Sequence, residues 1–400
     1  MKPVHALSST LLAALVLATC GANAADARGG SAAPSRPAFT SIVSFGDSLS
    51  DAGTYTPATV IPGTDPPIYL GGKFTTNWAS GSIWVEDVAA QLGLVVTPAE
   101  VGFAGQSVKC PAAALGLANT CTAYGQGGAR VTDPNGIGHV AGALTVPLKT
   151  QIANHLAAFQ RFKSTDLVTL WAGANDLLWQ IEPDPAINPD SFVIKYFQIQ
   201  AQLQAGLITA EQAAAQVAQA QRVSQAAMRT AATELAGYIR TQIVANGATH
   251  VVVMNLPDPV VTPEGAATAA AFPDIGAAMT SFSVAFNDGL RRGLHDSRVR
   301  TIDIRSLISD VVAHPSAHQM VNASVPACDP DKILAITGGG VTTGSALFCN
   351  ATPGVPWNAI RDGADVFTWY FADGNHPTTG GHRVIGDEVM RQLKSFGWIN

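Results

Sequence analysis

The chain has 400 residues, of which 47% are hydrophobic and 13% are charged, so it can bury a large core and is not expected to be disordered. Its formal net charge is −6 and no stretch is strongly basic, which argues against nucleic acid or an anionic membrane surface as the main partner. This length suits one large domain or two ordinary ones.

Residues 1–24 have the pattern of a secretory signal peptide. Lys2 provides the positive end, residues 11–18 form a short apolar segment, and residues 22–24 form a small-x-small cleavage site. The apolar segment is too short to span a bilayer and no later run reaches about 18 apolar residues, so we expect no transmembrane helix. Residues 25–36 are rich in Ala, Gly, Ser and Pro and are expected to form a flexible lead-in. The sequence therefore predicts a secreted or periplasmic protein.

The cysteines are consistent with export. Cys20 lies in the signal segment, and lipoprotein processing there is a rival interpretation, which the bulky Thr19 before it disfavours. The other four cysteines form an even set, which in an exported protein suggests disulfides, and their spacing does not match a zinc site. Among three pairings, proximity in the sequence favours Cys110 with Cys121 and Cys328 with Cys349.

The stretch from Ser41 to Gly53 organises the rest of the chain. It begins as a short apolar run, which predicts a buried strand, and then changes abruptly to small and polar residues. Ser48 lies at this break, where its hydroxyl is expected to be exposed and close to backbone N–H groups. A serine nucleophile needs a neighbouring base and a site for the oxyanion, and this place suits both. A capped turn leading into a helix explains the same residues, so the motif alone does not decide.

Residues 80–92 have apolar side chains at helical spacing and predict a helix. Residues 97–148 are dominated by Gly, Ala and Thr, with no sustained period. Within them, Gly127 and Gly128 would let backbone N–H groups approach a ligand closely. A mobile turn is the alternative explanation of such a pair.

The middle of the chain alternates between apolar runs and amphipathic segments, which predicts a parallel sheet covered by helices. After the first strand, further strands are expected at residues 166–171, 250–256 and 299–304. Helices are expected at residues 151–162, 198–245 and 282–294, the second of them interrupted near Gly206. Asn175 follows the second strand, at the edge where open α/β sheets place their ligands, although a helix cap is an alternative role.

Residues 314–365 form a long irregular region, which we expect to cover the site as a lid or rim. Asp373 and His376 follow, just before a proline and a final helix over residues 381–393. In an irregular turn the carboxylate can reach Nδ1 of the imidazole and leave Nε2 free, as a general base for a serine requires. Caps and turn bonds are the ordinary explanation of such a pair. His382, in the final helix, is expected at the surface.

Four motifs in this order resemble the GDSL, or SGNH, esterase/lipase family. They are Gly46-Asp47-Ser48-Leu49-Ser50-Asp51, the glycine pair at 127–128, Gly173-Ala174-Asn175-Asp176 and Asp373-Gly374-Asn375-His376-Pro377. Residues 73–78 and 253–258 are also similar to segments of that family, and the resemblance covers about residues 41–395. No Gly-x-Ser-x-Gly sequence is present, which separates the chain from the α/β-hydrolases.

The resemblance implies a flavodoxin-like three-layer α/β/α sandwich with a mostly parallel central sheet, as a single domain over residues 37–400. It implies an enzyme that hydrolyses small-molecule or lipid carboxylic esters through an acyl-enzyme, with no cofactor and no metal. A phospholipase or acyltransferase and a carbohydrate O-acetyl esterase are alternatives within the same family. A non-catalytic surface binding protein is the alternative of another class, because a fold does not guarantee a function.

The resemblance also implies a catalytic triad and an oxyanion site. The triad consists of Ser48 as nucleophile, His376 as base and Asp373 as the residue that orients the base. The oxyanion donors are the backbone N–H groups of Ser48 and Gly128 and the side-chain amide of Asn175. The residues that lead into the glycine pair, Ala-Tyr-Gly, depart from the family's usual Asn-aromatic-Ala. This departure leaves Gly127 open as an alternative to Gly128.

Overall fold

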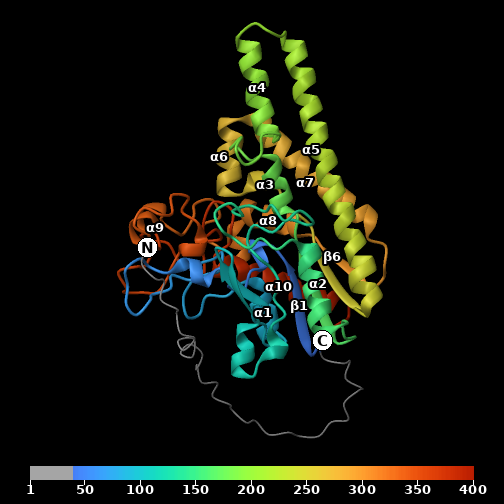
Figure 1. Ribbon diagram of the computed structural model, residues 1–400, viewed down its shortest axis with the longest axis vertical. Helices are drawn as coiled ribbons and strands as arrows, with labels where there is room; N and C mark the ends of the chain where they lie inside the picture. Colours follow the sequence, from blue (N-terminus) through green and yellow to red (C-terminus); the bar gives the residue numbers. More distant parts are fainter. Residues whose placement is uncertain (1–38) are drawn as a thin grey trace, which may run out of the picture. The chain divides into compact units, whose positions relative to one another are not determined.

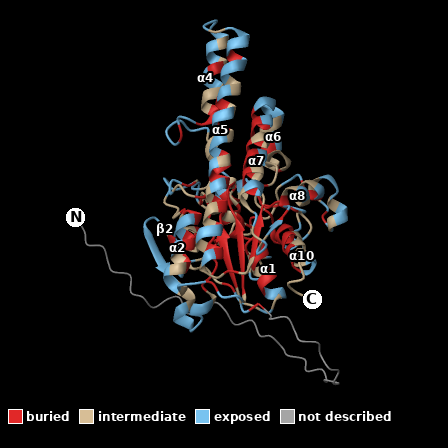
Figure 2. Ribbon diagram, turned by 90° about the vertical axis from the view of Figure 1, so that its right-hand side faces the viewer, coloured by how far each residue is buried: buried red, intermediate tan, exposed pale blue. Residues whose placement is uncertain are grey.

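A four-stranded parallel sheet lies at the centre of the computed structural model, which describes residues 39–400 (Figure 1). In order across the sheet the strands are β1 (Ser41–Gly46), β4 (Asp166–Trp171), β5 (His250–Met254) and β6 (Val299–Ile302). The inner strands are buried on both faces, which explains why they read as continuous apolar runs (Figure 2). The predicted mostly parallel sheet is confirmed. The predicted signal peptide, the alternative at Cys20 and the lead-in at residues 25–36 lie outside the described residues.

The free edge of β1 is covered by a short extended segment around Ala123. The Ser44 N–H donates to the Thr122 carbonyl oxygen at 2.9 Å, and the Tyr124 N–H donates to the Ser44 carbonyl oxygen at 2.8 Å. With this segment included, the order across the sheet is that of a flavodoxin-like fold, 2-1-3-4-5. The pairing also carries the following residues, which include the glycine pair, alongside the end of β1.

Helices cover both faces of the sheet, as the family resemblance implies. One layer packs on Val43, Val168 and Val253, and the other packs on the alternate positions of the same strands, such as Ile42 and Leu167. The first layer contains α2 (Leu148–Phe159), α5 (Ala210–Tyr238) and α7 (Pro273–Gly293). The second contains α1 (Trp84–Gln91), α8 (Ile304–Ala313) and α10 (Thr379–Ser395).

Two helices extend beyond the sheet as a hairpin. α4 (Phe192–Gln204) and α5 run side by side past the layers, and their junction lies at the far end (Figures 1 and 2). The predicted interruption near Gly206 is confirmed, because this residue has a φ of +68° and α5 begins four residues later. The Thr209 hydroxyl starts α5 by accepting a hydrogen bond from the Gln212 N–H at 3.2 Å. α3 (Ala174–Gln180) and α6 (Pro263–Ala271) lie at the base of this hairpin (Figure 1).

Sequence periodicity missed several pieces of regular structure, among them α6 and the first nine residues of α7. β2 (Glu100–Phe103) and β3 (Gln106–Lys109) form an antiparallel hairpin inside the region without a sustained period. Its two-residue turn has positive φ at Ala104 and Gly105, and alanine at such a turn gives no Asn-Gly or Asp-Gly signal. The irregular region at 314–365 contains α9 (Pro330–Ile336). Among the helices of residues 39–400, none is long and apolar enough to cross a bilayer.

The prediction that His382 lies at the surface is wrong. Its side chain is fully buried, because it shares one face of α10 with Ile385 and Val389, three and seven residues further on. Burial lowers the pKa of His382 to about 3. His155 on α2 is also buried, among aromatic rings that include Phe162 at 4.4 Å between ring centroids, and burial lowers its pKa to about 4.

These buried imidazoles should make the protein sensitive to acid. A histidine whose pKa is about 4 when folded and near 6.5 when unfolded binds protons more readily in the unfolded state, so stability falls as the pH drops from 6.5 to 4. His155→Phe should reduce this loss between pH 7 and pH 4.5 by about 2–3 kcal/mol. Urea unfolding at both pH values measures it, with the exposed His295→Phe as control. An unchanged pH dependence in His155→Phe would contradict the prediction.

Candidate active site

Ser48 lies immediately beyond the carboxyl end of β1, in a single turn of 3-10 helix over Ser48–Ser50. Asp47 caps this turn, because its Oδ1 accepts a hydrogen bond from the Leu49 N–H at 3.1 Å. A Cβ atom on Gly46 would lie 2.4 Å from the Trp171 carbonyl oxygen, so only glycine fits where the chain leaves the sheet beside β4. The abrupt change from apolar to small residues therefore brings the serine to the sheet edge.

Ser48 and His376 meet although 328 residues separate them. The distance between Ser48 Oγ and His376 Nε2 is 2.9 Å, and His376 Nδ1 lies 2.9 Å from each carboxylate oxygen of Asp373. The carboxylate is held in turn by the backbone N–H groups of Asn375 and His376, which donate to its Oδ1 at 3.0 and 2.8 Å. The structure thus brings together the three side chains that the motifs singled out.

The irregular region supports this acid. The Ala346 N–H donates to Asp373 Oδ2 at 2.7 Å, and the Asn77 amide donates to the Ala346 carbonyl oxygen at 3.0 Å. The disulfide Cys328–Cys349 fastens the same region three residues further on, and Cys110 is bonded to Cys121 elsewhere. Both pairings are those favoured by proximity in the sequence. Part of residues 314–365 therefore packs directly against the acid of the site.

The acid and the base polarise each other. Burial acts to lower the pKa of His376, but the charge and hydrogen bonding of Asp373 outweigh it, so this pKa lies above the ordinary value of 6.5. Burial acts to raise the pKa of Asp373, but the charge of His376 and the surrounding N–H donors hold it below its usual value. The pair therefore favours a carboxylate beside an imidazole of increased basicity.

The geometry distinguishes between the two glycines. The Gly127 N–H donates to Asp51 Oδ2 at 2.9 Å, so it is already occupied. The Gly128 and Ser48 N–H groups have no acceptor among residues 39–400. Asn175 is the second residue of α3, and its side-chain amide donates to the Ala129 carbonyl oxygen at 2.9 Å, which orients it beside the same loop. Two free backbone donors and one anchored amide therefore flank the end of the sheet.

Three further residues support the site and were not singled out from the sequence. Asp51, which directly follows the serine turn, joins this segment to the glycine loop. Its Oδ1 accepts from the Gly53 and Thr54 N–H groups, and its Oδ2 accepts from the Gly127 N–H. Phe74 packs on His376 with 4.9 Å between ring centroids. Gln151 bonds both the N–H and the carbonyl oxygen of Gly46, at 3.0 and 2.8 Å. Asp51 and Phe74 lie within the quoted family segments, whereas nothing local marks Gln151.

The described residues, 39–400, contain no group of three or more His, Cys, Asp or Glu side chains that could hold a metal ion. The side chains and backbone groups gathered at this site are a hydroxyl, an imidazole, a carboxylate and N–H donors. Such a set can activate a serine and stabilise an oxyanion.

Comparison with known proteins identified one family and one distant relative. The model of the family described as GDSL-like Lipase/Acylhydrolase matches residues 42–389. A phosphatidylcholine-sterol acyltransferase of Aeromonas hydrophila is 32% identical over 165 residues, which are 38% of this chain and 38% of that protein. The similarity to this relative therefore spans less than half the length of either protein.

Substitution of Gly128 should lower the stability of the fold for steric reasons that are independent of any catalytic role. Its φ is +78°, and an added Cβ would lie 1.9 Å from the Ile137 carbonyl oxygen. Gly63 has almost the same φ, +77°, but open space around it. We expect Gly63→Ala to lower the free energy of unfolding by about 1 kcal/mol and Gly128→Ala by about 2 kcal/mol more. Urea denaturation of both variants measures the difference, and equal losses would contradict it.

Proposed function

Since the chain belongs to the GDSL-like lipase/acylhydrolase family, we propose that it hydrolyses carboxylic esters with Ser48 as nucleophile, His376 as general base and Asp373 as the residue that orients the base. The observation that carries this proposal is the 2.9 Å contact between Ser48 Oγ and His376 Nε2, with Asp373 on the opposite nitrogen of the ring. A base within hydrogen-bond reach of a hydroxyl, and itself held by a carboxylate, is what serine activation requires.

Acylation follows from this arrangement. Ser48 Oγ attacks the ester carbonyl carbon while its proton passes to His376 Nε2, and the carbonyl oxygen becomes an oxyanion. The free N–H groups of Ser48 and Gly128 and the amide of Asn175 stabilise that charge, and each such donor contributes about 100- to 1000-fold in rate. Collapse of the intermediate breaks the bond to the alcohol, which leaves with the proton from His376. The acyl group remains on Ser48 as an ester.

Deacylation repeats these steps with a second acceptor. His376 takes a proton from a water molecule as the water oxygen attacks the acyl carbon, and Ser48 leaves with that proton, which releases a carboxylic acid. An alcohol in place of the water gives a new ester, so hydrolysis and acyl transfer share one mechanism. The distant relative is an acyltransferase by name, which makes transfer the second candidate activity for this chain.

The proposed substrate is a lipid or small-molecule ester, and the proposed location is outside the cytoplasm. The ring of Phe74 covers one side of His376 and gives the site an apolar wall, as an acyl chain would require. The signal pattern in residues 1–24 and the two disulfides support export, because disulfides persist in oxidising compartments.

Ser48→Ala should reduce hydrolysis of a nitrophenyl ester by about 10⁴-fold or more, because the nucleophile is lost while the fold is kept. Wild-type protein should also be labelled at Ser48 by a fluorophosphonate. Ser50→Ala is a matched control, since this neighbouring hydroxyl is buried and has no partner among the described residues. Full activity in folded Ser48→Ala, shown by circular dichroism, would refute the proposal. Acyl transfer is measured by adding an alcohol that competes with water for the acyl group, and by comparing the amount of new ester formed with the amount of carboxylic acid released.

The pH dependence of kcat/KM should follow His376. The base must be neutral, so activity rises with pH through a pKa that Asp373 holds above 6.5. In Asp373→Asn the effect of burial on the pKa of His376 prevails. The acidic limb of the pH profile of kcat/KM, where activity rises with pH, should therefore move to lower pH, while kcat falls by about 10⁴-fold. Glu264→Gln provides a comparison, because the charge of Glu264 also raises the pKa of His376, as a weaker contribution. A limb that stays in place in Asp373→Asn would contradict this assignment.

A further inference from the structure

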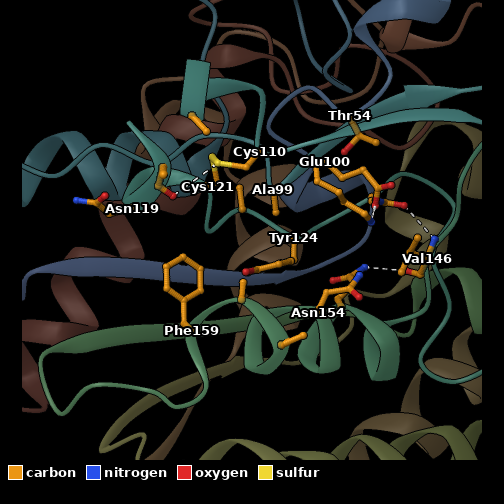
Figure 3. A pocket seen from close by; sticks show the side chains of 18 residues that line it. Thr54, Ala99, Glu100, Cys110, Asn119, Cys121, Tyr124, Val146, Asn154 and Phe159 are labelled. Atoms are coloured by element: carbon orange, nitrogen blue, oxygen red, sulfur yellow. Dashed lines mark hydrogen bonds and ion pairs between the residues drawn. A yellow bond between two sulfur atoms is a disulfide. The ribbon is translucent and has the colours of Figure 1, made fainter. Parts of the chain in front are cut away.

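A second cleft, of about 610 Å³, lies at the edge of the sheet and away from the triad (Figure 3). Its two walls are the loop closed by the disulfide Cys110–Cys121 and one side of α2, which carries Asn154 and Phe159. Its floor includes Tyr124, from the segment beside β1. The volume is typical of a binding site for a small molecule.

The walls of this cleft are mainly apolar. Alanine side chains face it from both sides, and the disulfide and an aromatic ring complete the apolar lining (Figure 3). The alanines are Ala113 and Ala118 on the disulfide loop and Ala157 and Ala158 on α2. Walls of this kind offer few hydrogen-bond partners for a sugar or a nucleotide, and they suit a flexible hydrocarbon chain.

Polar side chains also line the cleft, at Thr54, Glu100, Lys109, Asn119, Tyr124, Gln126, Gln151 and Asn154. Lys109 Nζ lies 2.5 Å from Glu100 Oε2, and the lysine side chain is 63% exposed whereas that of the glutamate is 9% exposed. One N–H bond of the ammonium therefore meets Glu100, and the others face solvent at the cleft. The Tyr124 hydroxyl lines the cleft and has no partner among residues 39–400, although the residue is only 7% exposed. The hydroxyl is therefore free to bond a polar ligand atom or water that enters the cleft.

The disulfide loop, which forms one wall of the cleft, has an apolar outer surface. Residues 110–121 carry no charged side chain, and Leu115 is 60% exposed and Leu117 is 44% exposed, although neither lines the cleft.

The cleft is separate from the proposed catalytic site. None of the triad residues or the oxyanion donors lines it. The side chains of Gln126 and Gln151 do line it, and they stand between it and the end of β1, because Gln151 bonds Gly46 and the Gln126 N–H donates to the Gly46 carbonyl oxygen at 3.2 Å.

We propose that this cleft binds a free fatty acid, with its hydrocarbon chain between the alanine walls and its carboxylate on Lys109. Glu100 takes one N–H of the Lys109 ammonium and offsets part of its charge, so the ligand carboxylate would bind the remaining N–H donors, which the exposed lysine presents at the mouth. A fatty acid is the acid product of lipid ester hydrolysis, but this binding does not depend on the proposed function. It requires neither Ser48 nor the acyl-enzyme.

The test is titration calorimetry with dodecanoate, below its micelle concentration, on protein whose Ser48 has been blocked with a fluorophosphonate or replaced by alanine. One saturable site per chain is expected. Ala158→Phe, which fills the cleft from α2, should weaken binding at least tenfold. Ala153→Phe is the matched control, because Ala153 is exposed on the same helix and does not line the cleft. Both variants should keep the circular dichroism spectrum and the urea midpoint of the parent protein, which shows that they fold.

The position of the carboxylate is tested by Lys109→Gln, which should weaken dodecanoate binding at least fivefold. Lys149→Gln is the control, because Lys149 is exposed on α2 and does not line the cleft. Absence of saturable binding, or unchanged binding in either Ala158→Phe or Lys109→Gln, would overturn the proposal. Because binding is measured with Ser48 blocked, such a failure is distinct from a failure of the catalytic proposal, which only the ester assay addresses.

Discussion

The hydrogen bond between Ser48 and His376 depends on almost everything else in the structure, because it joins the two ends of the domain. Parallel strands bring their carboxyl ends to one edge of the sheet, so β1 delivers the serine to the edge where the loop before α10 delivers the imidazole. A helix layer on each face keeps the sheet buried and in register. The contact of 2.9 Å is therefore a consequence of the whole α/β/α packing rather than of either motif alone.

Buried carboxylates hold the pieces of the site in place. Asp373 is surrounded by N–H donors from its own turn and from Ala346, and Asp51 accepts from three backbone N–H groups. Burial raises the pKa of Asp51 to about 6 and that of Asp47 to about 7. The donors around Asp373 and Asp51 satisfy those carboxylates, whereas Oδ2 of Asp47 has no partner among residues 39–400. The bonds to Asp51 and Asp373 would hold the proposed oxyanion donors in place before a substrate binds.

One segment serves both the proposed catalytic site and the second cleft. Residues 122–128 pair with the edge of β1, provide Tyr124 and Gln126 to the cleft and then provide Gly128 to the oxyanion site. The disulfide at Cys121 fastens the beginning of this segment to Cys110. Membership of the GDSL-like family explains the catalytic half, whereas the apolar cleft follows from this chain's own disulfide loop and alanine-rich walls.

The sequence by itself determined the parallel sheet and the helix layers, and it singled out Ser48, Asp373 and His376 as the proposed triad, because these inferences depend on periodicity and on motifs that are local in the chain. Only the tertiary structure decided that Gly128 rather than Gly127 has a free N–H, because Asp51 occupies the other one. It also decided that the irregular region supports Asp373, that the chain forms the hairpin of β2 and β3, and that His382 is buried. For Gly128 and Asp373 the physical reason is that hydrogen bonds between segments far apart in the chain leave no regular trace in the sequence of either segment. For the hairpin it is that alanine at the turn carries no turn signal, and for His382 it is that a helical face becomes buried only when another layer packs on it.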